Sequence, residues 1–313
     1  MLGIRQGRRT WFQFLILDPA VGLGVGFLYL ILKILPLKQA QKFGGFLGSL
    51  AYYLVPSRNK IGLKNMDVAF PNKPLSEKKR ILKAMWRHFG TLFGEVPHSK
   101  EVLQQATFGD TSSVRQAYQA GKGGFICSAH FGNWELPVAE QVIEGFHMNP
   151  VYRAANNPWL DKLLFQRREG TKIPKGTHGA RLMIETLQRG EFISILCDQK
   201  LREGIEVPFF GKPAMTASAI FNLAIKKGVP VIMVNAIRQP DMRYFITMFP
   251  PIPVPETGTL PEKIYAMTLY MNHVYEEWIR ANPEQWLWIH RRFDKSFYKD
   301  DIEQTPPQTT KAE

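Results

Sequence analysis

The stretch from Gly123 to Glu135 constrains the fold of this chain more than any other part of its sequence. Residues 125–129 form a short apolar run, which predicts a buried strand, and the run stops at His130. A small turn follows, and the apolar spacing over residues 134–144 then predicts an amphipathic helix. His130 and Glu135 therefore stand where a strand ends and a helix begins. In an open α/β sheet, ligands bind at that end of the strands.

The spacing of His130 and Glu135 permits a base–carboxylate pair only because the chain turns between them. Residues five apart in a continuous helix point about 140° away from each other. Across a turn they can meet, and a carboxylate can then fix the tautomer of a histidine that removes a proton from a hydroxyl. The sequence contains neither a His-Glu-x-x-His zinc motif nor a Gly-x-Ser-x-Gly nucleophile motif, so we expect no metal and attack by the substrate's own hydroxyl. The alternative is a histidine that satisfies a buried turn.

Strand and helix patterns alternate along the chain from about residue 111. Such repetition predicts an α/β fold, a mostly parallel sheet flanked by helices. Hydrophobic residues make up 45% of the 313 residues, enough for a full core. The expected strands span residues 125–129, 148–153, 192–197, 229–237 and 243–249, and the expected helices span residues 134–144, 158–168, 180–189, 216–227 and 260–282.

The N-terminal part is apolar with basic borders. Residues 11–35 are mostly apolar, but the longest uncharged run has only 14 residues, fewer than the roughly 20 that span a membrane. Basic residues flank this run on both sides, and a second apolar segment ends at Pro56. We expect residues 1–56 to form a membrane anchor with interfacial helices, as a single span or in the membrane plane; a buried first helix is the alternative. Residues 57–298 would form the catalytic domain and residues 299–313 a disordered tail.

The chain is strongly basic, with 40 Lys and Arg against 27 Asp and Glu and a net charge of +13. Such a field attracts polyanions: nucleic acid, an anionic membrane or an acidic protein. The basic residues are scattered and no nucleic-acid-binding motif is present, so we expect no nucleic-acid partner. The two cysteines, Cys127 and Cys197, lie in apolar runs, which indicates buried thiols and gives no metal-ligand spacing.

Further charged residues stand at positions where an acidic substrate could bind. Asp198 follows the apolar run 192–197, so it also stands at the end of a strand. Arg167 and Arg168 close a predicted helix, and guanidinium groups suit phosphates and carboxylates. These residues also have alternative, purely structural roles. The arginines could be favourable cations at a helix C-terminus, and Asp198 could be a turn or helix-cap residue. Phe209 and Phe210 suggest either an acyl-chain wall or core.

Taken together, several motifs resemble one known family, the late acyltransferases of lipid A biosynthesis, which are lauroyl and myristoyl transferases in the lysophospholipid acyltransferase superfamily. The resemblance covers roughly residues 10 to 295. Its motifs are Asn-Met-Asp-Val-Ala-Phe-Pro at 65–71, Ser-Ala-His-Phe-Gly-Asn-Trp-Glu at 128–135, Asn-Pro-Trp-Leu at 157–160, Asp-Gln at 198–199, Val-Pro-Phe-Phe-Gly at 207–211 and Pro-Glu-Gln-Trp-Leu-Trp-Ile-His-Arg-Arg-Phe at 283–293.

The resemblance implies an inner-membrane enzyme, anchored by its N-terminus, whose catalytic domain faces the cytoplasm. It implies an acyl thioester donor, usually acyl carrier protein, a Kdo-bearing lipid A precursor as acceptor, contact with the phospholipid surface, and no cofactor. His130 would be the general base and Glu135 its partner. Asn133 would steady the oxyanion, and Arg167 or Arg168, together with Asp198, would lie near the acceptor. A glycerophospholipid acyltransferase and a non-catalytic membrane-surface binding protein are the alternative functions.

Overall fold

A seven-stranded sheet forms the centre of the protein, in the order β1-β9-β8-β2-β5-β3-β4. The computed structural model describes residues 18–136, 146, 148–152, 157, 161, 171–174 and 176–298. Strands β8, β2, β5, β3 and β4 run parallel, whereas β9 pairs antiparallel with β8 and β1 pairs parallel with β9. The prediction of a mostly parallel sheet is therefore confirmed. The strands are β1 Thr107–Phe108, β2 Gly124–Ser128, β3 Met148–Tyr152, β4 Ile173–Pro174, β5 Phe192–Leu196, β8 Val231–Arg238 and β9 Tyr244–Pro251.

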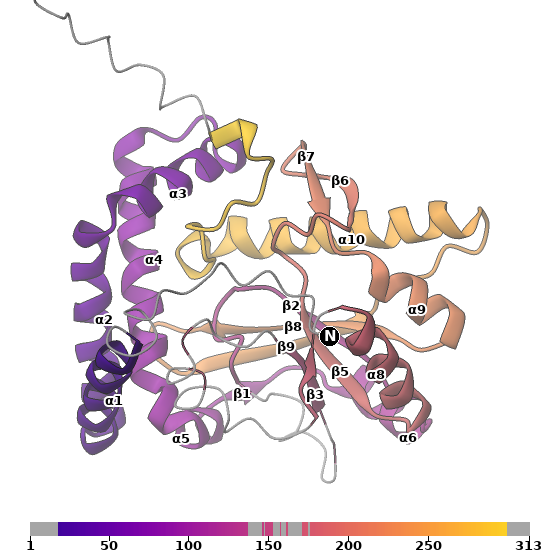
Figure 1. Cartoon of the computed structure of the whole chain (residues 1–313), viewed down its shortest axis with the longest axis horizontal. Helices are drawn as coiled ribbons and strands as arrows, with labels where there is room; N and C mark the ends of the chain where they lie inside the picture. Colours follow the sequence, from indigo (N-terminus) through magenta and orange to yellow (C-terminus); the bar gives the residue numbers. More distant parts are fainter. Residues whose placement is uncertain are drawn as a thin grey trace, which may run out of the picture.

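Helices cover both faces of the sheet, and the side chains of the central strands β2, β5 and β8 alternate between two apolar clusters. In β2, Phe125 and Cys127 belong to one cluster and Ile126 to the other. The first cluster packs under the long helix α10, which crosses over the sheet in Figure 1. Helices of the first face are α8 Thr177–Gln188, α9 Ala219–Lys227 and α10 Leu260–Ala281; those of the second are α5 Ser99–Gln104 and α6 Ser112–Gln119.

Four N-terminal helices stand at one end of the sheet: α1 Asp18–Ile34, α2 Leu37–Leu54, α3 Pro56–Ala69 and α4 Leu75–Glu95. Helices α2 and α4 lie side by side (Figure 1) at a distance that only glycine allows. A Cβ atom at Gly44 would lie 2.4 Å from the carbonyl oxygen of Gly90, and one at Gly48 would lie 2.1 Å from that of Trp86. Within the described residues, the structure contains no helix that is both long and apolar enough to cross a membrane.

One expected helix begins later than the sequence pattern indicates. Residues 205–216 form a separate hairpin, β6 Ile205–Phe209 and β7 Lys212–Thr216, in which Thr216 pairs with Ile205. The helix predicted from residue 216 therefore starts at Ala219, because Thr216 is held in the hairpin ladder. Most of the predicted helices 134–144 and 158–168 lies outside the described residues.

Candidate active site

The turn after β2 is fixed by its backbone. Gly132 has a φ of +58°, and a Cβ atom there would lie 1.9 Å from the carbonyl oxygen of Ala236, so the position requires glycine. The amide of Gly132 donates to the carbonyl of Gln285 at 3.0 Å, and the amide of Asn133 donates to the carbonyl of Ala236 at 2.9 Å. The carbonyl of His130 accepts from the amide of Leu287 at 3.0 Å. The turn is thus clamped between β8 and the segment that follows α10.

His130 and Asp198 meet because β2 and β5 are neighbouring parallel strands, with Ser128 opposite Leu196 in the register. His130 lies two residues after Ser128, and Asp198 lies two residues after Leu196. The Nδ1 atom of His130 lies 2.8 Å from Oδ1 of Asp198. The Asp198 side chain is 2% exposed and that of His130 is 20% exposed, so the carboxylate is sealed and the imidazole is open on one side.

Asp198 remains ionised in this buried position. Burial by itself would raise its pKa, but the charge of His130 and hydrogen bonds from His130 and from the Trp286 indole outweigh burial and lower the pKa to about 2. The Trp286 indole N–H donates to Oδ2 at 2.9 Å. Because an anionic carboxylate only accepts, Nδ1 of His130 must carry the hydrogen, and Nε2 of the neutral ring then holds the lone pair.

Three side chains surround the open part of the His130 ring. The side-chain amide nitrogen of Gln199 lies 3.1 Å from Nε2. The rings of Trp134 and His290 lie 5.4 and 6.2 Å from the His130 ring between centroids. Burial, and to a lesser degree the charges of His130 and two arginines, lowers the pKa of His290, which keeps this second imidazole neutral at physiological pH. The basic Nε2 atom of His130 therefore lies in a partly apolar environment.

Glu135 and Asn133 take different positions beside His130. Glu135 is exposed, and its backbone amide donates to Oδ1 of Asn133 at 3.2 Å. The hydrogen bonds described for the His130 ring end on Asp198 and Gln199, so the pairing of His130 with Glu135 stays a prediction. Asn133 is 4% exposed, and its side-chain amide donates to Glu95; its oxyanion role also stays a prediction.

Arg167 and Arg168 lie outside the described residues, and their contact with the acceptor stays a prediction. Among the residues that the structure does describe, no group of three or more His, Cys, Asp or Glu side chains is arranged to hold a metal ion.

Trp286, His290 and Glu95 contribute to the site, but the sequence assigned them no role. Trp286 and His290 stand in the Trp-Leu-Trp-Ile-His motif, so the motif marked them, but nothing local connects them to His130. Glu95 is the last residue of α4, and no sequence motif marks it. The second arginine of the same motif, Arg292, is fully buried; it donates to the carbonyl of Met215 at 3.0 Å and to Oγ1 of Thr216 at 2.7 Å. That arginine holds the β6–β7 hairpin.

A partly open histidine, oriented by a buried carboxylate at the strand ends of a mostly parallel sheet, defines a site that can remove a proton from a hydroxyl. Comparison with known proteins gives the family. The profile of the family described as "Bacterial lipid A biosynthesis acyltransferase" matches residues 11–295. The chain therefore belongs to the bacterial lipid A biosynthesis acyltransferases, as the sequence motifs indicated.

Two relatives from Escherichia coli agree with the family. The chain is 27% identical over 285 residues to the lipid A biosynthesis palmitoleoyltransferase of Escherichia coli K12, covering 86% of this chain and 89% of that one. It is 26% identical over 281 residues to the lipid A biosynthesis lauroyltransferase of the same organism, covering 87% and 90%. The crystal structure of the 1-acyl-sn-glycerophosphate acyltransferase PlsC from Thermotoga maritima matches with a TM-score of 0.36 and 15% identity, covering 77% of this chain and 99% of that one. This protein is an acyltransferase of lipid A biosynthesis.

Proposed function

We propose that this enzyme transfers a fatty acyl chain from acyl carrier protein to a hydroxyl on a primary acyl chain of a Kdo-bearing lipid A precursor. His130 acts as the general base, and the acceptor hydroxyl attacks the thioester directly. The 2.8 Å contact between His130 Nδ1 and the buried, ionised Asp198 is the observation that carries this mechanism, because it leaves Nε2 as the basic nitrogen on the open side.

The reaction is complete without a covalent acyl-enzyme intermediate. Nε2 of His130 takes the hydroxyl proton while the hydroxyl oxygen forms a bond to the thioester carbonyl carbon. The tetrahedral intermediate then collapses, the carbon–sulfur bond breaks, and the imidazolium returns its proton to the leaving thiolate. The acceptor hydroxyl must take the place beside Nε2 that the Gln199 amide now occupies.

Two carboxylates compete for the role of partner to His130. The family resemblance gives that role to Glu135. The contact geometry favours Asp198, whose carboxylate is within hydrogen-bond distance of the ring and is buried, so water does not weaken the interaction. We propose that Asp198 orients the ring and stabilises the imidazolium, a different role from the acceptor contact expected from the sequence.

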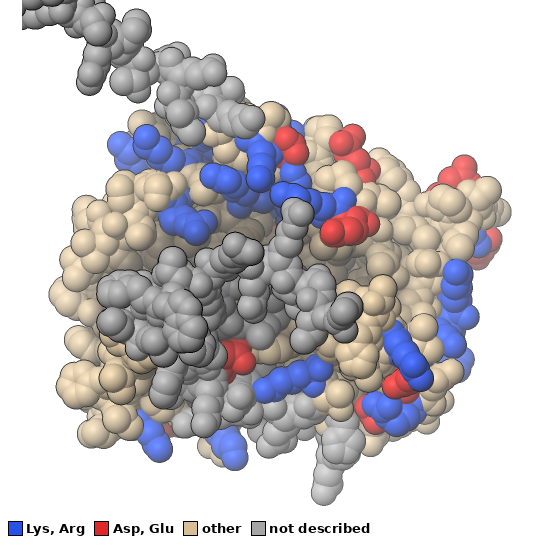
Figure 2. Space-filling model, in the orientation of Figure 1, with Lys and Arg blue, Asp and Glu red and all other residues tan. Residues whose placement is uncertain are grey.

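Cations around the site favour an acidic donor and a phosphorylated acceptor. Figure 2 shows Lys and Arg side chains gathered along the upper part of one face, where Figure 1 places α3 and the segment after α10. The positive charge of Arg58 on α3 is one of those that lower the pKa of His290. Arg291, the residue after His290, is exposed. Lys200 follows Gln199 and pairs with Asp294 at 2.7 Å.

An exposed apolar stripe supports contact with a membrane surface. On α1, the stripe consists of Leu23, Phe27, Leu30 and Ile34, which are 55–83% exposed and recur at helical spacing. Helix α2 continues it with exposed Phe46, Leu50, Tyr53 and Leu54. Exposed apolar side chains in such a row are typical of a surface that rests on lipid. We propose that these helices seat the enzyme on the cytoplasmic side of the inner membrane.

The test is a reconstituted transfer reaction. The protein is mixed with an acyl carrier protein thioester and a Kdo-bearing lipid A precursor, and the product is identified by mass spectrometry. We expect one acyl chain to be added, and His130→Ala to abolish the addition while the protein stays folded by circular dichroism. Near-normal turnover of His130→Ala would exclude the proposed mechanism.

The same assay separates the other functions. Transfer to a lysophospholipid but not to the lipid A precursor would favour a glycerophospholipid acyltransferase, and no transfer at all would favour a binding protein. Membrane seating is tested by extraction: we expect detergent to release the protein and high salt alone to leave it bound. Release by salt alone would contradict an embedded apolar stripe.

A further inference from the structure

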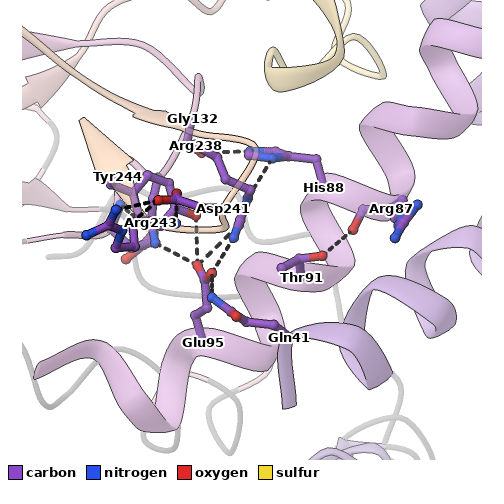
Figure 3. A network of polar contacts seen from close by, with 12 residues as sticks. Gln41, Arg87, His88, Thr91, Glu95, Gly132, Arg238, Asp241, Arg243 and Tyr244 are labelled. Atoms are coloured by element: carbon purple, nitrogen blue, oxygen red, sulfur yellow. Dashed lines mark hydrogen bonds and ion pairs between the residues drawn. The ribbon is translucent and has the colours of Figure 1, made fainter. Parts of the chain in front are cut away.

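A second buried carboxylate, Glu95 at the end of α4, lies beside the turn that carries His130. Figure 3 shows it in one network with Arg238 and Gly132. Glu95 is 2% exposed and accepts hydrogen bonds from four side chains. Its Oε1 accepts from the Gln41 amide at 2.8 Å and from Arg238. Its Oε2 accepts from the Asn133 amide at 3.0 Å, from the Tyr244 hydroxyl at 2.8 Å and from Arg238 at 3.2 Å. The charge of Arg238 balances the buried carboxylate.

Arg238 extends the same network to the neighbouring residue of the turn. Its Nε donates to Nδ1 of His88 at 3.3 Å, so Nδ1 is the acceptor and Nε2 of His88 carries the hydrogen. That N–H then donates to the carbonyl of Gly132 at 3.1 Å. Burial and the charge of Arg238 lower the pKa of His88 to about 3, so His88 is a neutral, fixed donor rather than a titrating base.

The network thus touches two consecutive residues of the turn from the side of α4. His88 contacts the Gly132 carbonyl and Glu95 contacts the Asn133 side chain. On the other side, Asp198 holds the His130 ring and Gln285 accepts from the Gly132 amide at 3.0 Å. These two residues, Gly132 and Asn133, are the second and third after the base. A buried ion pair that served stability alone would not need to contact them.

We propose that Glu95 is a positioning residue for the reaction. Through Asn133 directly, and through Arg238 and His88 to Gly132, it fixes the turn and hence the distance of His130 Nε2 from the acceptor hydroxyl. The same carboxylate also binds Gln41, so it joins helix α2, which carries part of the apolar stripe, to the catalytic turn. The inference rests on the proposed role of His130. A displacement of a catalytic group by about 1 Å can lower the rate roughly 10²-fold.

The experiment compares two Glu95 variants with a matched control in the full chain. Glu95→Gln removes the charge, and its single oxygen cannot accept both from Gln41 on one side and from Asn133 and Tyr244 on the other. Glu95→Asp keeps the charge but withdraws the carboxylate by one methylene, so it serves if the first variant does not fold. The control is Lys78→Met, which breaks a 2.7 Å ion pair with Asp67 at the other end of the same helix and lies away from the turn.

Two readouts are measured: kcat and KM in the transfer assay, and hydrogen exchange of the peptide that contains residues 131–135. We expect either folded Glu95 variant to lower kcat by roughly 10²-fold with KM changed less than about threefold, since positioning affects the reacting geometry. We also expect faster exchange of the Gly132 and Asn133 amides. Lys78→Met should retain kcat and the wild-type exchange of this peptide.

The outcomes separate the two proposals. A folded Glu95 variant with wild-type kcat, wild-type exchange of residues 131–135, or a loss of kcat that Lys78→Met reproduces would overturn the positioning role. His130→Ala is run in the same assay. If that variant keeps its turnover, the proposed mechanism fails, while the exchange measurement still reports whether Glu95 fixes the turn.

Discussion

Two buried carboxylates, Asp198 and Glu95, flank one turn, and they differ in what they bind. Both residues are 2% exposed. Asp198 faces His130, a titratable group whose side chain is 20% exposed to solvent. Glu95 faces Arg238, a permanent cation whose side chain is 9% exposed. A carboxylate paired with an open imidazole can respond to a moving proton, whereas one paired with a buried guanidinium holds its partners still. The comparison assigns proton chemistry to one side of the turn and geometry to the other.

Among the variants that keep His130, the largest effect is expected from Asp198→Asn. An asparagine can present its amide to Nδ1 and thereby place the hydrogen on Nε2, so the base is lost although the shape is kept. We expect kcat to fall roughly 10³- to 10⁴-fold, as removal of a carboxylate that orients a histidine does elsewhere. Steady-state kinetics with the thioester and lipid A precursor measure this.

Glu135→Gln, assayed in parallel, sharpens the choice between the two partners. If Asp198 orients the ring, Glu135→Gln should lower kcat less than Asp198→Asn does. The reverse order would return the partner role to Glu135.

Arg238→Met tests the structural side of the comparison. It leaves the Glu95 carboxylate buried without its cation, and breaking a buried pair in this way costs about 3–5 kcal/mol of the free energy of unfolding. Chemical denaturation monitored by tryptophan fluorescence measures the loss. The double variant Glu95→Gln/Arg238→Met removes both charges and should recover part of that stability. If Arg238→Met alone were as stable as the wild type, the ion pair would not contribute to the free energy of unfolding.

His88→Gln isolates a pH effect. The pKa of His88 is about 3 in the folded protein against 6.5 as its ordinary value, so between these pH values the unfolded chain binds a proton that the folded protein does not. The wild type should therefore lose stability as pH falls from 7, by about 2 kcal/mol at pH 5 from this residue. We expect His88→Gln to show a shallower loss in denaturation curves at pH 7, 6 and 5. Equal slopes would mean that His88 also takes up a proton in the folded protein.

The smallest effect is expected from Arg243→Ala. Arg243 pairs with Asp241 beside the same network (Figure 3), but the two side chains are 58% and 48% exposed. Solvent screens such a pair, so stability and kcat should remain unchanged within error. A measurable loss of kcat would mean that the Glu95 network extends to the loop between β8 and β9.

Much of the scaffold followed from local patterns. The apolar run before His130 predicted β2, and the repeated strand and helix patterns predicted the mostly parallel sheet, because burial on both faces imposes recognisable residue types. The pattern failed at Thr216, where a hairpin partner eleven residues earlier, Ile205, rather than local helix propensity, set the conformation. Such pairing is not visible in a short window of sequence.

By itself, the sequence determined the family, the small turn after the apolar run, and the histidine that stands at the end of β2, since each is a local motif. Only the tertiary structure decided which carboxylates reach the turn. Asp198, 68 positions after His130, arrives through the register of two parallel strands. Glu95, 38 positions before Asn133, arrives at the end of helix α4, which stands at one end of the sheet. The sequence placed a carboxylate five residues from the base, but the strand register brought a different one within 2.8 Å of it.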